Sequence, residues 1–87
     1  MKAKFKLEFT PRFERRFTSL DRQTQVRILR ELQILTENPY AGKLLRGEWK
    51  SVYSLRVGDY RVLYFVEEER VILLTVGHRR HICRESV

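Results

Sequence analysis

The stretch that decides the fold is Val52-Tyr-Ser-Leu-Arg-Val-Gly-Asp-Tyr-Arg-Val-Leu-Tyr-Phe-Val66. Its β-branched and aromatic residues are typical of strands. Gly58-Asp59 suits a two-residue hairpin turn, because glycine accepts a positive φ at the first turn position. A second hairpin returns through residues 67–70 into the apolar run 71–76. The last third of the chain therefore predicts a meander of three antiparallel strands.

The two-residue turn also sets the register of the first hairpin. Val57 then pairs with Tyr60, and Arg56 lies opposite Arg61. Because side chains alternate between the two faces of a strand, Arg56 and Arg61 project from one face and the apolar residues from the other. The face that should meet the rest of the fold carries Tyr53, Leu55, Val57, Tyr60, Val62 and Tyr64. We expect the arginines on the opposite, open face.

The residues before the hairpins predict one strand and two helices. Lys4 to Phe9 alternates polar and apolar residues, as a half-buried strand does. Thr10-Pro11 suits the start of a first helix, and Asp21 caps a second that stops near Asn38, since a proline follows there. The helices must bury their apolar stripes on one face of the sheet. We therefore predict a single α+β domain over residues 1–87, with the order β-α-α-β-β-β and a small, mainly antiparallel sheet.

Two features of this middle region are less defined. Val26 and Ile34 lie off the apolar arc of the second helix, so they either touch the first helix or face a partner. Residues 40–51 are rich in Gly, Lys and Arg and predict a loop that leads into the sheet. The apolar arc itself comprises Ile28, Leu29, Leu32 and Leu35.

Charge and composition limit the classes of partner. The formal net charge is +7 and the pI about 10.1, which implies an acidic ligand such as nucleic acid, an anionic membrane or an acidic protein. No apolar stretch approaches the ~20 residues that cross a bilayer, so no membrane-spanning segment is predicted, and we expect no membrane partner. Cys83 is the single cysteine and cannot form an internal disulfide, which favours a reducing, cytoplasmic location.

Three basic segments converge at one end of the predicted sheet. Because the second hairpin runs back antiparallel, residues 77–80 finish beside Tyr60 and Arg61, and the acids of residues 67–69 lie at the far end. Guanidinium groups bind phosphate through paired hydrogen bonds and stay protonated, so they stabilise developing negative charge. Only His78 and His81 have an unperturbed pKa that suits a general base. The alternative is a solvated basic face without a ligand.

Metal and cofactor chemistry finds little support in the sequence. The two histidines are three residues apart, and the single cysteine lacks spaced carboxylates around it, which is a weak set for zinc. We predict neither a metal nor a cofactor.

Three motifs resemble the RelE/ParE superfamily of bacterial and archaeal toxin–antitoxin systems, on the RelE side. They are Lys43-Leu-Leu-Arg-Gly47, the run from Tyr53 to Tyr64, and Val76-Gly-His-Arg-Arg80, and the resemblance extends over nearly the whole chain. It implies a RelE-like toxin that cleaves mRNA in the ribosomal A site without a metal. The RNA's own 2′-hydroxyl attacks the adjacent phosphate, leaving a 2′,3′-cyclic phosphate and a 5′-hydroxyl. The resemblance also implies a RelB-like antitoxin in an oligomeric toxin–antitoxin complex.

The resemblance assigns roles residue by residue. Arg61 matches the family's phosphate-binding arginine, and Arg79 matches the arginine that stabilises the transition state or protonates the leaving oxygen. Arg56 falls where one branch has a catalytic lysine, whereas Ser54 replaces that branch's second lysine and Cys83 replaces a tyrosine of many members. The remaining residues predicted to bind RNA are Lys43, Arg46, Lys50, His78, Arg80 and His81.

Two alternatives to a ribosome-dependent endoribonuclease remain. One is a ParE-like inhibitor of DNA gyrase, which shares the fold without needing the arginine cluster. The other is a catalytically weakened relative that mainly binds its antitoxin, for which Ser54 and Cys83 are the motive. The predicted antitoxin surface is the set of apolar residues on the open face beside the arginines, since exposed apolar patches mark interfaces. That set is Leu63, Phe65, Ile72 and Leu74.

Overall fold

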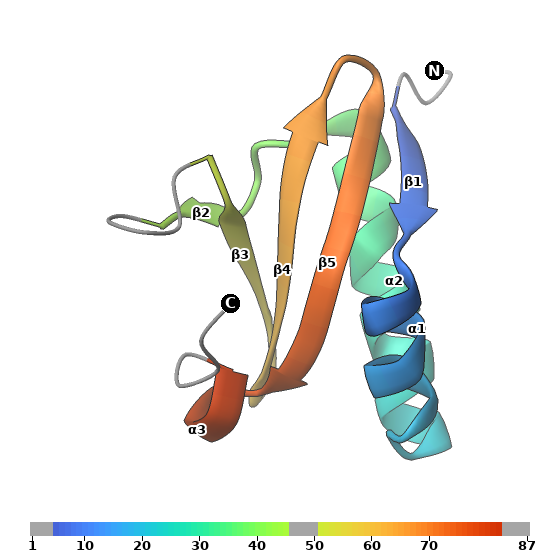
Figure 1. Cartoon of the computed structure of the whole chain (residues 1–87). Helices are drawn as coiled ribbons and strands as arrows, with labels where there is room; N and C mark the ends of the chain where they lie inside the picture. The colour runs from blue at the N-terminus through green and yellow to red at the C-terminus, as the bar shows by residue number, and fades with distance from the viewer. Residues whose placement is uncertain (1–4, 46–50, 83–87) are drawn as a thin grey trace.

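The chain forms a five-stranded sheet with its two longer helices on one side. The computed structural model describes residues 5–45 and 51–82 (Figure 1). Its elements are β1 (Lys6–Phe9), α1 (Pro11–Thr18), α2 (Arg22–Glu37), β2 (Lys43–Leu44), β3 (Tyr53–Val57), β4 (Tyr60–Glu67), β5 (Arg70–His78) and α3 (Arg79–Ile82). The strand order is β1-β5-β4-β3-β2, and β1 alone pairs in parallel, with β5. The predicted α+β class and mainly antiparallel sheet are confirmed.

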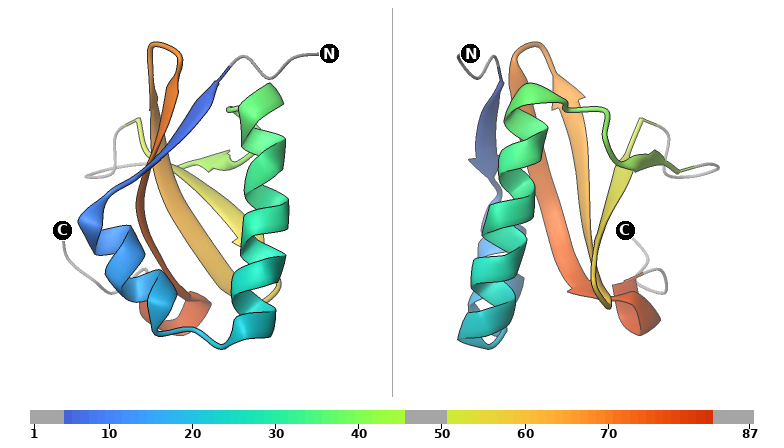
Figure 2. Two further views of the ribbon diagram at one scale, coloured as in Figure 1. Left: turned by 90° about the vertical axis from the view of Figure 1, so that its right-hand side faces the viewer. Right: turned by 180° about the vertical axis from the view of Figure 1, so that it is seen from behind.

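The core lies between the sheet and the two longer helices. α2 crosses one face of the sheet, while α1 continues the line of β1 beside β5 (Figures 1 and 2). The face of β3 and β4 predicted to be apolar is the one that meets the helices, since Leu55, Val57, Val62 and Tyr64 are buried there. The helices contribute Phe13, Ile28, Leu32 and Leu35 to the same cluster.

Both predicted helix starts are confirmed by their capping bonds. The Thr10 hydroxyl accepts a hydrogen bond from the Phe13 amide at 3.2 Å, and it donates to the Leu73 carbonyl at 2.7 Å, which ties α1 to β5. The Asp21 carboxylate accepts bonds from the hydroxyl and amide of Thr24, and these bonds lower the pKa of Asp21. α2 ends at Glu37 with Asn38 as its cap, as the following proline predicts.

Two short elements escaped the sequence prediction. β2 occupies part of the predicted loop 40–51, and α3 is a single turn after β5. Neither is long enough to show a hydrophobic period. The segment before β2 is held by the Tyr64 hydroxyl, which accepts a bond from the Gly42 amide at 2.9 Å. A Cβ at Gly42 would lie 2.6 Å from that oxygen, so only glycine fits; burial raises the pKa of Tyr64.

A β-bulge in β5 shifts the phase of its alternation. Leu63 pairs with Thr75 but Tyr64 pairs with Leu73, so Leu74 is the extra residue. Beyond the bulge, Gly77 lies opposite Arg61 on the open face and His78 lies opposite Tyr60 on the face toward the helices. The prediction that Leu74 simply alternates with Ile72 on the open face misses this bulge.

The apolar side chains on the open face of the sheet are buried or partly buried, although neither of the two longer helices covers that face. Leu63 and Ile72 are only 3% and 7% exposed, and Phe65 and Leu74 are partly buried, so the predicted exposed apolar surface is wrong. In addition, the buried Ile82 of α3 comes within 3.4 Å of the Cβ position of Gly77.

Exposed apolar side chains lie elsewhere, and half of those among the described residues are on α2. Val26 and Ile34 are 47% and 46% exposed, so α1 does not cover them. None of the helices in the described ranges is long and apolar enough to cross a membrane. The large exposed apolar residues are Phe9, Val26, Leu29, Ile34, Tyr40 and Leu44.

Candidate functional site

Three arginines from three elements meet where the β3–β4 turn adjoins the end of β5. Arg56 lies directly opposite Arg61, and Arg61 pairs in turn with Gly77. The amide of Arg79 donates to the Asp59 carbonyl at 2.8 Å, which ties the start of α3 to the hairpin turn. We call this group, Arg56, Arg61 and Arg79, the arginine end.

The arginine end carries positive charge that its neighbours leave unsatisfied. Like charges directly opposite each other on adjacent strands are destabilising. Arg56 makes a long bond, from Nε to the Gly58 carbonyl at 3.4 Å, and the buried Nε of Arg61 has no hydrogen-bond partner among the described residues. A buried donor without a partner costs about 1–3 kcal/mol. An anion bound to these guanidinium groups would reduce the repulsion between them.

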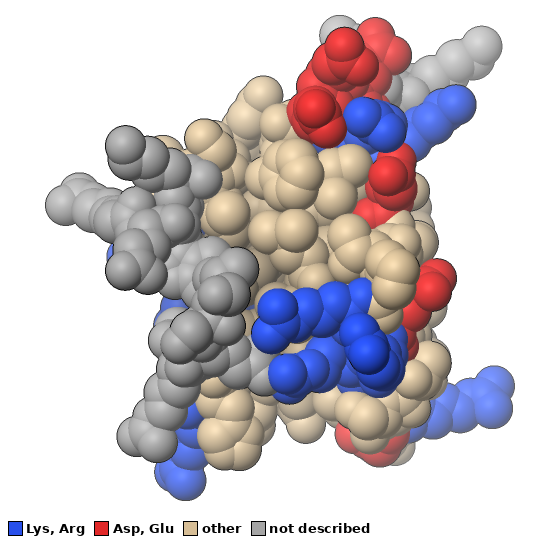
Figure 3. Space-filling view, in the orientation of Figure 1, with Lys and Arg blue, Asp and Glu red and all other residues tan. Residues whose placement is uncertain are grey.

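The opposite end of the sheet has the reverse charge. Figure 3 shows acidic side chains over the β4–β5 turn and basic ones over the lower half of β5 and the adjoining α1. At the acidic end, Arg70 forms ion pairs with Glu8 at 3.1 Å and Glu67 at 3.3 Å. Within residues 5–45 and 51–82, no carboxylate forms an ion pair with Arg56, Arg61 or Arg79.

The other lysines and arginines predicted to bind RNA lie on β2, on α3 or outside the described residues. Lys43 is exposed on β2 and pairs with Ser54, so it lies on the same face as Arg56, two residues away along β3. Arg80 is exposed on α3. Arg46, Lys50 and Cys83 lie outside the described residues. Ser54 is buried, with 6% exposed.

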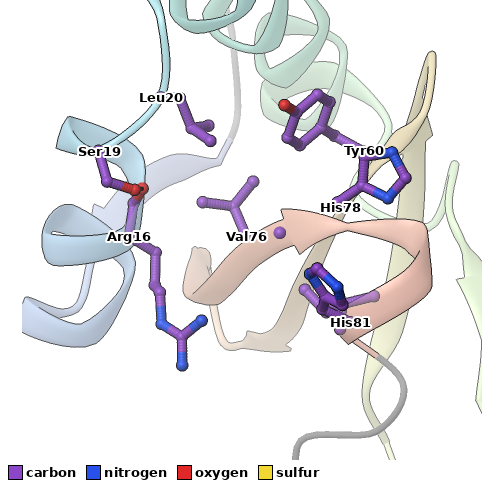
Figure 4. A pocket seen from close by; sticks show the side chains of 9 residues that line it. Arg16, Ser19, Leu20, Tyr60, Val76, His78 and His81 are labelled. Atoms are coloured by element: carbon purple, nitrogen blue, oxygen red, sulfur yellow. Dashed lines mark hydrogen bonds between the residues drawn. The ribbon is translucent and has the colours of Figure 1, made fainter.

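The two histidines lie around the end of the sheet, in a hollow toward α1. The rings of His78 and Tyr60 are 5.5 Å apart at 76°, and those of His78 and His81 are 6.1 Å apart. They line a half-open cavity of about 220 Å³ between the end of α1 and the end of β5 (Figure 4). We call this cavity the histidine pocket. The α1 side of its wall is Arg16, Ser19 and Leu20.

The sequence alone did not reveal this pocket. Its walls come from segments about 60 positions apart in the chain, and no local motif links Ser19 with His78. The bulge at Leu74 turns His78 toward the helices, away from the face of Arg56 and Arg61. The structure therefore brings together the three arginines at one site and the two histidines at a neighbouring one.

The chain is similar in sequence to known proteins. Residues 7–82 match the family described as ParE toxin of type II toxin–antitoxin system, parDE. Toxin RelG of Mycobacterium tuberculosis is 44% identical over 45 residues, which is 49% of this chain and 52% of that relative. The match thus spans about half the length of the curated relative.

Solved structures match over more of the chain. The RelBE2 toxin–antitoxin complex of Mycobacterium tuberculosis contains a chain that is 28% identical, with a TM-score of 0.82 over 91% of this chain and 95% of that one. The intact RelBE toxin–antitoxin complex of E. coli contains one that is 29% identical, with a TM-score of 0.71 over 85% and 95%. With a family match over most of its length and this fold, the chain belongs to the RelE/ParE superfamily of toxins of type II toxin–antitoxin systems.

Proposed function

We propose that this protein arrests translation by cutting mRNA in the ribosomal A site. The observation that carries the proposal is the Arg56–Arg61 pair: two like charges lie opposite each other, and neither forms an ion pair with a carboxylate in the part of the chain that the structure describes. A phosphodiester supplies the negative charge and the acceptor oxygens that this pair lacks. The resemblance of the sequence to RelE-like toxins, from which mRNA cleavage is expected, leads us to propose RNA as the source of that phosphate.

The reaction needs little from the protein beyond charge and position. The 2′-hydroxyl of the RNA attacks the adjacent phosphorus, the bond to the 5′-oxygen breaks, and a 2′,3′-cyclic phosphate and a 5′-hydroxyl result. Arg61 holds the phosphate, while Arg56 and Arg79 stabilise the charge that builds on the phosphoryl oxygens. Arginine is a poor base because it stays protonated. Lys43, directly across from Ser54, places an amine-bearing side chain on the same face.

A RelB-like antitoxin is part of this proposal. The helices present an apolar hollow of about 340 Å³ lined by Phe9, Phe13, Phe17 and Leu29, with Glu14 and Thr18 at its edge. The protein carries a net charge of +7, so an acidic segment with an apolar face complements this surface. Leu29→Lys should weaken binding of a co-expressed RelB-like antitoxin at least tenfold and leave RNA cleavage intact. An unchanged dissociation constant would contradict this placement of the antitoxin.

Inhibition of DNA gyrase is the second candidate, because the matching family is described as ParE. It does not need the arginine end. A catalytically weakened toxin that mainly binds its antitoxin is the third, motivated by Ser54 in place of a lysine.

One paired experiment separates these candidates. A translation extract programmed with a defined mRNA receives the purified protein, and primer extension maps the cuts with and without ribosomes. A gyrase supercoiling assay runs beside it with the same protein. We expect ribosome-dependent cuts with 5′-hydroxyl ends and normal supercoiling. Loss of supercoiling without cuts would replace the proposal with gyrase inhibition, and no effect in either assay would indicate the weakened toxin.

A further inference from the structure

We propose that the histidine pocket binds one base of the RNA, next to the phosphate held at the arginine end. The inference rests on the proposed function for the identity of the polymer. It goes beyond that function in assigning a base-binding subsite to residues outside the arginine end.

Size and walls both favour a flat, partly apolar ligand. Pockets that enclose drug-sized ligands measure roughly 300–1,000 Å³, so a cavity of about 220 Å³ suits a single ring system. Leu20, Val76 and Ile82 form apolar walls, and Tyr60 adds an aromatic one. A phosphate group alone gains nothing from apolar walls, whereas a base buries its faces against them.

The polar groups of the pocket suit the edge of a base. Nδ1 of His78 accepts the Arg80 amide at 3.2 Å, so a neutral His78 carries its proton on Nε2 and presents a donor to a ligand. The Ser19 hydroxyl donates to the Arg16 carbonyl at 2.7 Å, which leaves it as an acceptor. Donors and acceptors alternate on a base edge, and the residues that line the pocket include no carboxylate to repel the RNA backbone.

The histidine pocket and the arginine end are adjacent in the fold. Tyr60 and Arg61 are consecutive residues of β4, and His78 and Arg79 are consecutive at the end of β5. Tyr60 pairs with His78 and Arg61 with Gly77, so the two sites lie on opposite faces of the same two rungs of the sheet. The sheet ends here, and Arg79 follows directly. An RNA strand therefore passes around this end with a phosphate on one side and a base on the other.

The test is a titration of the full-length protein followed by the ring ¹H–¹³C signals of His78 and His81. The probes are the four ribonucleoside 5′-monophosphates, each alone, and inorganic phosphate as the ion control. We expect at least one mononucleotide to give saturable shifts at both rings, with inorganic phosphate giving none at the same concentration. The shifts should persist in Arg61→Ala, since the pocket is separate from the arginine end.

A blocking variant and its matched control complete the test. Ser19→Trp fills the pocket from its exposed α1 rim and should weaken mononucleotide binding at least tenfold, whereas Thr18→Trp, one residue away and outside the pocket wall, should not. If Ser19→Trp does not fold, His81→Ala takes its place with His78 as the reporter.

Three results would overturn the inference: no saturable shift with any mononucleotide, equal shifts with inorganic phosphate, or shifts that the blocking variant leaves unchanged. The mRNA cleavage assay is independent of this titration. A protein that binds a base but cuts no mRNA refutes the proposed function alone, and one that cuts mRNA without binding a base refutes the subsite alone.

Discussion

Arginine has two different roles at the two ends of this sheet. At the β4–β5 turn, Arg70 is paired with Glu8 and Glu67 across exposed positions, so its charge is neutralised within the fold. At the other end, Arg56 and Arg61 lie side by side, and the structure gives neither of them a carboxylate among the residues it describes. The difference shows that composition does not distinguish a structural arginine from one available to a ligand. The interaction partners that the fold places around an arginine make that distinction.

The largest expected effect comes from removing Arg61. Arg61→Ala should lower ribosome-dependent mRNA cleavage by about 100-fold, because the loss of the residue that holds the phosphate misplaces the reacting groups, and should abolish growth arrest. Arg70→Ala is the matched control, because it removes the same charge at the paired end and should retain full cleavage. Equal losses in the two variants would mean that net charge, not position, matters.

Arg79 should contribute to binding through a phosphate contact. For Arg79→Ala, the slope of log affinity for single-stranded RNA against log salt should become shallower by roughly 0.7, the value for one lost phosphate contact. Filter binding or fluorescence anisotropy at several salt concentrations measures this slope. A slope identical to that of the unaltered protein would remove Arg79 from the interface.

Arg56 opposes Arg61, so stability and activity should change in opposite directions there. Arg56→Thr relieves a like-charge pair and places a β-branched residue in a strand, which should raise the free energy of unfolding by about 0.2–1 kcal/mol. Urea denaturation measures the gain, and the same variant should cleave mRNA more slowly. Destabilisation by this change would show that Arg56 has a structural role.

The smallest effect should come from Arg70. Its ion pairs are about half exposed, so Arg70→Ala should lower the free energy of unfolding by less than about 1 kcal/mol. The loss should shrink further at 1 M salt, where surface charges are screened. A cost well above this, persisting at high salt, would show that Arg70 stabilises β1 against β5 by packing.

Several parts of the fold were predictable because their signals are local. Thr10-Pro11 and Asp21 start helices through bonds to residues three positions on, and Gly58-Asp59 sets the register that places Arg56 opposite Arg61. The features that the sequence did not predict depend on non-local contacts. The bulge at Leu74 and the burial of Leu63 and Ile72 depend on parts of the chain that are distant in sequence, which no period in the sequence reveals.

The sequence by itself determined the class of the fold, the excess of positive charge and the presence of three arginines near one hairpin end. These follow from residue type and spacing, which act over a few positions. Only the tertiary structure decided which arginines form ion pairs, on which face of the sheet His78 lies, and that a pocket forms between α1 and β5. Pairing and burial depend on groups brought together from distant parts of the chain, so the same residue type neutralises a carboxylate at one end and, within the described residues, forms no ion pair at the other.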